Sequence, residues 1–323
     1  MKAVVCTTYG SAEGLQLQSI TKPTPKENEV LIKIQATTVT AGDVFVRKLT
    51  LPLYVFLWPL ARFAFGIKNL RKSILGHEFS GEIEAAGSAV KDFAPGDHVF
   101  GTTTGLNQGS YAEYICVPAD GVLAPKPSNM TFIQAAAVPV GGLTALTFLK
   151  KANIQAGQKV LIYGASGSVG TYAVQIAKHF GAVVSGVCST TNLELVESIG
   201  ADHVIDYTQT DFTQGEAIYD VIFDAVGKIS SAQAKGVLKP NGKYLTIKSV
   251  IKEKREELFE LQQLAESGQL TAVIDRTYPL EGIAEAHRYV EKGHKKGNLV
   301  IDLFKPRKTS EVSLGMTEKT SEV

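Results

Sequence analysis

The segment KVLIY-GASGSVG-TYAVQIAKHFG, residues 159–181, contains the clearest structural signal in this 323-residue chain. An apolar β-patterned run leads into a turn with glycines at every third position, and an amphipathic helical pattern follows at once. Such glycines allow a tight turn and a close approach of backbone to a pyrophosphate, and the helix start offers free N–H groups. The segment therefore predicts a dinucleotide-binding turn with contacts from Gly164, Ala165, Ser166, Gly167, Ser168, Val169 and Gly170.

On both sides of this turn, short apolar runs alternate with helical patterns. That alternation is typical of βαβ units, which build a parallel sheet covered by helices. The chain is therefore assigned to the α/β class, with a doubly wound parallel-sheet domain over residues 126–267 that ends in a charged helix around 254–267. The predicted strands are Lys159–Tyr163, Val183–Cys188, His203–Asp206, Tyr219–Asp224 and Lys243–Ile247.

The rest of the chain has a different pattern. Residues 1–125 alternate β-patterned runs with turn residues, which predicts an all-β module, a barrel. Residues 268–304 are expected to return to that module, and the polar tail 305–323 is expected to be disordered. The predicted elements are strands at Met1–Thr7, Glu29–Thr38, Glu82–Ala86, His98–Gly101, Ala112–Val117, Val273–Asp275 and Asn298–Phe304, and a helix near Gly282–Glu291.

The end of the second parallel strand bears on the choice of dinucleotide. A carboxylate at that place accepts hydrogen bonds from the ribose 2′-hydroxyl of NAD and repels the 2′-phosphate of NADP. Here the strand continues into Ser189, Thr190 and Asn192, with no carboxylate and also no arginine. Hydroxyl and amide donors favour a phosphate. The expected cofactor is NADPH, with NADH as the alternative.

Composition excludes several classes of function. Lys and Arg total 33 against 32 Asp and Glu, a net charge of +1, which argues against binding to nucleic acid. The apolar segment 51–61 is interrupted by Pro52 and Pro59 and is too short to span a membrane. Three scattered cysteines fit a reducing compartment, and the N-terminal apolar run is too short for a secretory signal. The protein is therefore expected to be cytoplasmic.

Further motifs indicate a family. They are the glycine turn together with GHEFSG (76–81), PGDHV (95–99), GGLTA (141–145) and GADHVI (200–205). With these motifs the chain resembles the zinc-independent quinone oxidoreductase branch of the medium-chain dehydrogenase/reductase superfamily. The resemblance implies a GroES-like β-barrel catalytic domain, a Rossmann domain and an active-site cleft between the two.

The resemblance also permits a test for zinc. Zinc members hold the metal with two cysteines and one histidine. His77 stands at the histidine position, but Thr40 and Val140 stand at the cysteine positions, and residues 101–114 contain no cysteine-rich loop. We therefore expect no zinc. The alternative role for His77 and Glu78 is a hydrogen-bonded, partly buried structural pair.

Without a metal, conjugated acceptors are the expected substrates. A quinone or an α,β-unsaturated carbonyl spreads the charge of an incoming hydride through its own conjugation, whereas an isolated ketone needs a Lewis acid. The expected function is NADPH-dependent hydride transfer to a small hydrophobic quinone or enone. Two alternatives stay open: a metal-free alcohol or carbonyl dehydrogenase, and a non-catalytic dinucleotide-binding protein.

The resemblance implies candidate catalytic residues. Thr40 and Asp43 would lie beside the nicotinamide, where Thr40 can donate one hydrogen bond; the alternative for Asp43 is a loop-capping carboxylate. Phe45 replaces a tyrosine found in some members, and Tyr54 is a weaker candidate. Segment 51–65 falls where the family has a variable loop over the substrate pocket, so it is either an apolar pocket wall or ordinary core or interface.

More cofactor contacts follow from the same resemblance. Relatives also insert a helix and a strand where this chain has only residues 248–253. The last Rossmann strand is therefore expected to be shortened or absent, which puts in question a homodimer paired through that edge. The further cofactor contacts are Thr144, Tyr207, Ala225, Val226, Gly227, Thr246, Ile247, Gly297 and Asn298.

Overall fold

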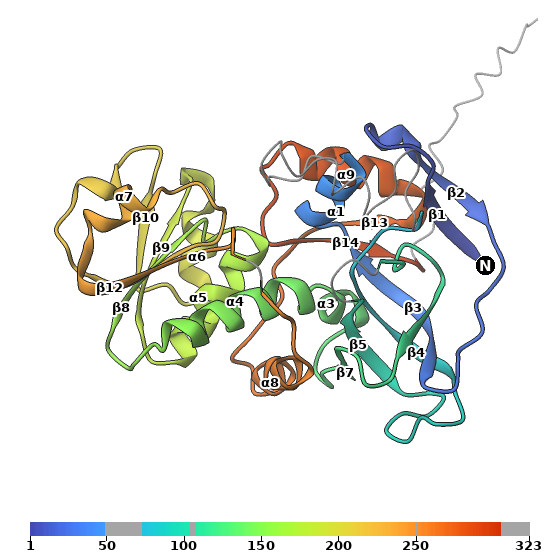
Figure 1. Ribbon diagram of the computed structural model, residues 1–323. Coiled ribbons are helices and arrows are strands. Elements are labelled where there is room, and N and C mark those ends of the chain that lie inside the picture. The colour runs from blue at the N-terminus through green and yellow to red at the C-terminus, as the bar shows by residue number, and fades with distance from the viewer. Residues whose placement is uncertain (49–72, 104–107, 250, 305–323) are drawn as a thin grey trace, which may run out of the picture.

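The computed structural model describes residues 1–48, 73–103, 108–249 and 251–304. Within them the chain forms two units, one around a parallel sheet and one around a mixed sheet, joined by long helices (Figure 1). Tyr54, segment 51–65 and the tail 305–323 lie outside the described residues, so the expectations placed on them stay predictions.

The parallel sheet contains the five strands that the sequence predicts. Their order is β10-β9-β8-β11-β12, and every neighbouring pair is parallel. In the part of the chain that the structure describes, this sheet ends at β12, so no sixth strand follows the short connector 248–253. The strands are β8 (Lys159–Tyr163), β9 (Val183–Cys188), β10 (His203–Asp206), β11 (Tyr219–Asp224) and β12 (Leu238–Thr246).

Helices cover both faces of this sheet because its strands are apolar on both sides. Val160 and Ile162 of β8 pack into one core with residues of α4 and α5, and Leu161 points into the opposite core with Ala234 of α7. This alternation is the period-two pattern of a strand buried on both faces. The helices of this unit are α4 (Pro139–Ala152), α5 (Ser168–His179), α6 (Leu193–Ser198) and α7 (Ser231–Lys235), with short η3 (Thr190–Asn192) and η4 (Phe212–Gln214).

The mixed sheet is built from both ends of the chain. Its order is β13-β14-β3-β4-β5-β7, with β6 paired to β3, and β1 and β2 form a separate antiparallel pair. The C-terminal strands β13 and β14 therefore lie in the same sheet as strands of the N-terminal segment. The strands are β1 (Lys2–Cys6), β2 (Leu15–Ser19), β3 (Glu29–Thr38), β4 (Glu78–Ala86), β5 (His98–Thr102), β6 (Tyr114–Pro118), β7 (Leu123–Pro125), β13 (Ile274–Pro279) and β14 (Asn298–Asp302).

The prediction of an all-β N-terminal module is wrong at one place. Residues Ala41–Lys48 form helix α1, which lies beside α9 (Ile283–Glu291) (Figure 1). Thr40 and Asp43 close the helix start reciprocally: the Asp43 N–H donates to Thr40 Oγ1 at 3.1 Å, and the Thr40 N–H donates to Asp43 Oδ2 at 2.8 Å. Such a capping pair, Thr-x-x-Asp, is visible in the sequence and would have predicted the helix.

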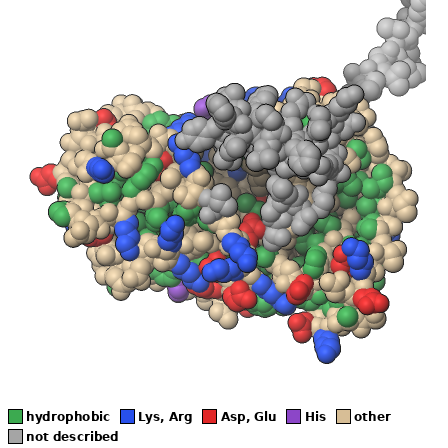
Figure 2. Space-filling view, in the orientation of Figure 1, with side chains coloured by type: hydrophobic (Ala, Val, Ile, Leu, Met, Phe, Trp, Pro, Cys, Tyr) green, Lys and Arg blue, Asp and Glu red, His purple; other side chains and the backbone are tan. Residues whose placement is uncertain are grey.

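Three further helices complete the described structure. α3 packs on the mixed sheet and leads into α4, and α8 packs against α4 and β7, so both connect the two units. No helix in the described part of the chain is long and apolar enough to cross a bilayer. Figure 2 shows Lys and Arg interspersed with Asp and Glu on the visible face, as the small net charge leads one to expect. The remaining elements are α3 (Phe132–Ala136), α8 (Arg255–Glu266), α9 (Ile283–Glu291), η1 (Ala12–Gly14) and η5 (Leu280–Gly282).

Candidate active site

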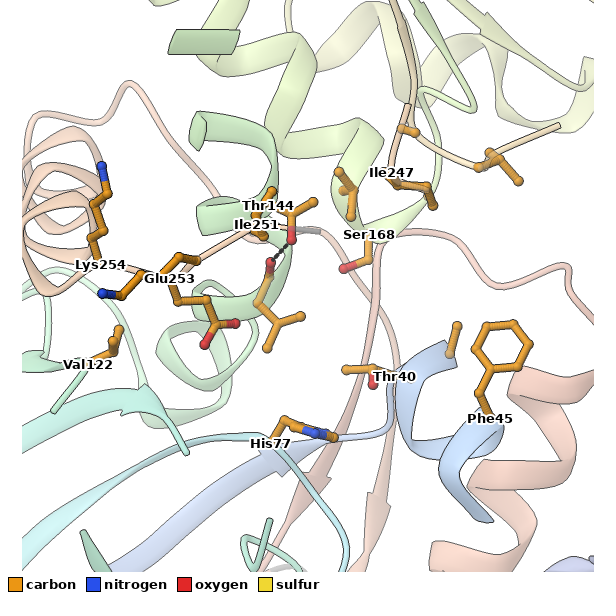
Figure 3. Close-up of a pocket in the computed structure, with 18 of the residues that line it drawn as sticks. Thr40, Phe45, His77, Val122, Thr144, Ser168, Ile247, Ile251, Glu253 and Lys254 are labelled. Atoms are coloured by element: carbon orange, nitrogen blue, oxygen red, sulfur yellow. Dashed lines mark hydrogen bonds between the residues drawn. The ribbon is translucent and has the colours of Figure 1, made fainter. Parts of the chain in front are cut away.

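A cleft of about 1470 Å³ lies between the two units. Pockets for small ligands typically span roughly 300–1,000 Å³, so this one has room for a large ligand or for two ligands. Figure 3 shows Thr40 and His77 on one side of the cleft and Ser168 and Thr144 on the other. Its lining comes from α1, α4, α5, the ends of β11 and β12, the connector before α8, and the segment after α9.

The glycine turn forms one wall. Gly167, at the N-terminal boundary of α5, has no side chain to cap the helix, so the N–H groups of the first turn face the cleft without a capping side chain. Gly164 has φ +77°, and a Cβ on Gly170 would lie 2.1 Å from the Gly164 carbonyl oxygen. Both glycines are therefore required by the turn itself. These features fit a dinucleotide pyrophosphate at the start of α5.

The C-terminal segment closes over this turn. The Gly297 N–H donates to the Ser166 carbonyl at 2.8 Å, and Ser168 Oγ donates to Asn298 Oδ1 at 2.5 Å. Asn298 is 2% exposed, and its amide nitrogen donates to Tyr172 Oη. The predicted contact Asn298 therefore anchors the turn from behind, and it does not line the cleft.

The loop after β9 uses most of its own donors. The Thr190 hydroxyl donates to Asp206, and the Asn192 amide donates to Ser166 Oγ at 3.2 Å and to Ser189 Oγ at 3.0 Å. Asn192 Oδ1 is buried without a hydrogen-bond partner among the described residues. The predicted residues Ser189, Thr190 and Asn192 are thus together at one end of the glycine turn.

A cation that sequence reasoning missed reaches this loop. Lys296 Nζ donates to the Thr191 carbonyl at 3.1 Å, across 105 residues of sequence. Lys296 precedes β14 and so comes from the mixed-sheet unit. No local pattern in the sequence indicates this contact, because it depends on how the two units pack.

A buried aspartate shapes the loop after β11, which contains the predicted cofactor contacts Ala225, Val226 and Gly227. Asp224, at the end of β11, is fully buried and accepts from the N–H groups of Val226, Gly227 and Ile229, which shapes the loop there. Tyr207 is 52% exposed.

The predicted site residues in the described part of the chain fall into two groups. Those that line the cleft are Thr40, Thr144, Gly167, Ser168, Val169, Ala225, Val226 and Ile247. Those that do not line it are Asp43, Gly164, Ala165, Ser166, Gly170, Ser189, Thr190, Asn192, Tyr207, Gly227, Thr246, Gly297 and Asn298.

The opposite wall contains a buried carboxylate with two partners. Asp43 is fully buried; its Oδ2 accepts from the Thr40 hydroxyl at 2.7 Å, and its Oδ1 lies 2.9 Å from His77 Nδ1. Burial raises the pKa of Asp43. The hydrogen bond and charge of His77, together with the hydrogen bonds from Thr40, outweigh burial and hold that pKa below its usual value. Asp43 therefore orients Thr40 and His77, and these two residues face the cleft.

His77 and Glu78 do not pair with each other, which corrects the expected structural pair. Glu78 accepts from the Thr38 hydroxyl and from the Val140 N–H, the latter at 2.7 Å. Burial raises the pKa of Glu78 to about 8 against these hydrogen bonds. The reason for the correction is the strand geometry, since adjacent residues entering β4 point to opposite sides.

A half-buried lysine completes the cleft. Lys295 lines it and donates to the Gly297 carbonyl at 2.7 Å. Burial lowers the pKa of Lys295 to about 8, against the charges of Glu78 and Asp275. Sequence reasoning did not select this residue either.

In architecture and site, this is the class of two-domain oxidoreductases that bind a nicotinamide dinucleotide in the cleft between a Rossmann sheet and a GroES-like unit. The family model "Alcohol dehydrogenase GroES-like domain" matches residues 26–128, and "Zinc-binding dehydrogenase" matches residues 199–301. The chain belongs to the medium-chain dehydrogenase/reductase superfamily, in its quinone oxidoreductase branch.

Similar proteins support this assignment along nearly the whole chain. The chain is 35% identical to the 2-methylene-furan-3-one reductase of Solanum lycopersicum and 34% identical to the chloroplastic NADPH-dependent alkenal/one oxidoreductase of Arabidopsis thaliana. Each match covers 93% of this chain and 79% of the relative. The solved quinone oxidoreductase of Coxiella burnetii is 28% identical with a TM-score of 0.79, over 94% of this chain and 99% of that one.

Proposed function

We propose that this protein is an NADPH-dependent oxidoreductase that transfers hydride to a quinone or an α,β-unsaturated carbonyl without zinc. The observation behind the proposal is the cleft between the two units, in which the uncapped start of α5 faces Thr40 and His77. The printed names of the relatives, among them a quinone oxidoreductase and an NADPH-dependent alkenal/one oxidoreductase, support the same class of substrate.

The residues present fit a bound NADPH, which would supply the hydride. The first turn of α5 would hold the pyrophosphate, and the exposed ring of Tyr207 offers a face for the adenine. Ala225, Val226 and Ile247 line the cleft beside α5. Gly164 and Gly170 would keep the turn tight without touching the ligand, and Asn298 would hold Ser168 in place.

The preference for NADPH over NADH rests on charge at the loop after β9. That loop has no carboxylate of its own, and Lys296 brings a positive charge to Thr191. The hydroxyls of Ser189 and Thr191 lie 3.5 Å apart and are not committed to a carboxylate. A 2′-phosphate would therefore meet one ammonium group and two hydroxyls, and Asp206 is occupied by Thr190 and Thr208.

The absence of zinc is proposed from the donor set. Thr40 and Val140 occupy the two cysteine positions, and a threonine hydroxyl and a valine cannot replace thiolates. His77 is the one remaining family ligand, and its Nδ1 is bound to Asp43. In the described residues, no three His, Cys, Asp or Glu side chains gather as a metal site.

An apolar acceptor suits the cleft. Phe45 and Val226 are each 40% exposed and line it from the two units. A flat conjugated ring or enone can lie between such surfaces with its carbonyl directed at Thr40 and His77. Tyr54 remains a predicted catalytic residue that the described part of the chain does not include.

The test is the oxidation of NADPH and NADH by the purified protein in metal-free buffer, with a quinone, an enal and a plain ketone as acceptors. Loss of NADPH that depends on the quinone or the enal is the expected result. Turnover of the plain ketone alone would favour a carbonyl dehydrogenase, and saturable NADPH binding without turnover would favour a binding protein. Zinc at one equivalent in the active protein would contradict zinc independence.

We also propose a cytoplasmic location, supported by the thiols of Cys6, Cys116 and Cys188, which are all free. Fractionation of cells that express a tagged full-length chain tests this location. Recovery in an organelle fraction would contradict it.

A further inference from the structure

We propose that His77 is the proton donor of the reaction, a catalytic residue that Asp43 orients toward the acceptor carbonyl. The inference rests on the proposed function and assigns a role to a side chain that the sequence reading treated as structural.

Thr40 cannot serve as the donor in the observed arrangement. Its hydroxyl hydrogen points to Asp43 Oδ2 at 2.7 Å, while the same oxygen accepts from the Asp43 N–H at 3.1 Å. A hydroxyl has one hydrogen to donate, and here the helix cap uses it. The resemblance to the family implies that Thr40 lies beside the nicotinamide with one hydrogen bond to donate; in the structure that hydrogen is used within the cap of α1.

His77 remains as a donor on this wall. Its side chain is 19% exposed and lines the cleft, and its Nδ1 lies 2.9 Å from the buried Asp43. An ionised carboxylate only accepts, so Nδ1 carries the hydrogen of that bond. No described residue forms a hydrogen bond with Nε2, and Nε2 is not among the buried unpartnered atoms, so it is open to the cleft.

This arrangement determines which form of the ring can donate. Because Asp43 keeps a hydrogen on Nδ1, Nε2 carries a hydrogen only when the ring is an imidazolium. Burial lowers the pKa of His77, but the hydrogen bond and charge of Asp43, with the charge of Glu253, outweigh burial and raise that pKa above the usual 6.5. Glu78, whose own pKa is about 8, adds to this effect only as it ionises. The cationic side chains that line the same cleft are Lys228, Lys252, Lys254, Arg255 and Lys295.

The step balances for an enone. A bound reduced cofactor would supply hydride to the β-carbon, and the alkene electron pair would then move to give an enolate oxygen. His77 donates the Nε2 proton to that oxygen, and the N–H electron pair stays on Nε2 as the lone pair of a neutral ring. The enol becomes the saturated ketone in water, and the ring regains a proton from solvent. One enone, one reduced cofactor and one proton are consumed.

The main test compares His77→Gln with wild type and with His203→Gln, an exposed histidine on β10. Loss of a general acid typically costs about 10²- to 10⁴-fold, so kcat/KM for an enal should fall by that amount in His77→Gln, with the Kd for NADPH unchanged. His203→Gln should match wild type. The wild-type kcat/KM should fall as pH rises through the raised His77 pKa, and this limb should be missing in His77→Gln.

A second variant separates orientation from proton donation. Asp43→Asn removes the charge that raises the pKa of His77, so histidine NMR of the cofactor-free protein should show a lower pKa for His77, and the pH limb should move the same way. An unchanged His77 pKa in a folded Asp43→Asn protein would contradict the positioning role. This readout does not depend on turnover.

The outcomes distinguish the two proposals. Wild-type turnover with His77→Gln within twofold of it would overturn the proton donor and leave the proposed function standing. Stoichiometric zinc that wild type contains and His77→Gln lacks would overturn it as well, because His77 would then be a metal ligand. A wild-type protein inert toward every quinone and enone would overturn both.

Discussion

Gly167 and Gly170 serve different purposes within one turn. A Cβ on Gly170 would lie 2.1 Å from the Gly164 carbonyl oxygen and 2.8 Å from Ala165 Cα, which are backbone atoms that cannot rotate away. A Cβ on Gly167 would lie 3.4 Å from the same oxygen with no other atom within 4 Å, and Gly167 lines the cleft. The first glycine is therefore needed for ligand approach and the second for packing.

This difference predicts opposite effects of two alanine substitutions. Gly170→Ala should destabilise the fold by about 1–3 kcal/mol, the usual cost of overpacking. Gly167→Ala should keep the melting temperature and raise the Kd for NADPH by about tenfold, because its methyl group would occupy the space of the pyrophosphate. Thermal melts and fluorescence titration measure the pair. Equal stability losses in both variants would contradict this division.

At the scale of elements, the segment between α9 and β14 bridges the two units. Gly297 donates to Ser166 in the glycine turn, and the neighbouring Lys296 reaches the loop after β9. The segment that closes over the proposed dinucleotide site therefore comes from the other sheet. On this proposal, cofactor selectivity depends on how the units pack as well as on the end of β9.

Lys296→Gln is expected to weaken NADPH and spare NADH. A hydrogen bond to a charged group is worth about 1.5–3 kcal/mol, so the Kd for NADPH should rise by roughly tenfold or more, while that for NADH stays unchanged. Lys292→Gln, at an exposed position nearby in the sequence, is the control. Calorimetric titration with 2′,5′-ADP and 5′-AMP isolates the 2′-phosphate. Equal weakening of both ligands would refute a selective role.

At the scale of the whole molecule, Glu78 couples the units. It belongs to β4 of the mixed sheet and accepts from the Val140 N–H at the start of α4. Burial raises its pKa from 4.5 to about 8. Between these two pH values the carboxyl is mostly neutral in the folded protein and mostly ionised in the unfolded chain. Stability from this group is therefore fully present below about pH 4.5 and is lost as pH rises to about 8.

Glu78→Gln should remove that dependence. Glutamine keeps a neutral side chain that accepts a hydrogen bond, so the variant should resemble wild type near pH 4.5 and be more stable than wild type at pH 8. Urea unfolding across this range measures the free energy of unfolding of each protein. Parallel pH profiles for the two proteins would show that Glu78 is ionised in the folded state.

The local patterns of the sequence were enough to predict the parallel sheet, the glycine turn and the return of the C-terminal strands. These features depend on residue periodicity and on glycines that a tight turn demands, both of which are local. The helix α1 was also encoded locally, in Thr40 and Asp43, but that pair was interpreted by resemblance as catalytic. The capping bonds give Thr40 and Asp43 a structural role in α1, and their role in the reaction stays a prediction.

Only the tertiary structure decided which residues meet at the cleft and at the loop after β9. The bonds from Asp43 to His77 and from Lys296 to the Thr191 carbonyl join residues that are 34 and 105 positions apart. Burial determined two further features. Asn298 is buried behind the glycine turn and does not line the cleft, and burial raises the pKa of Glu78. Long-range pairing and desolvation depend on the packing of both units, and no pattern within a single segment contains that information.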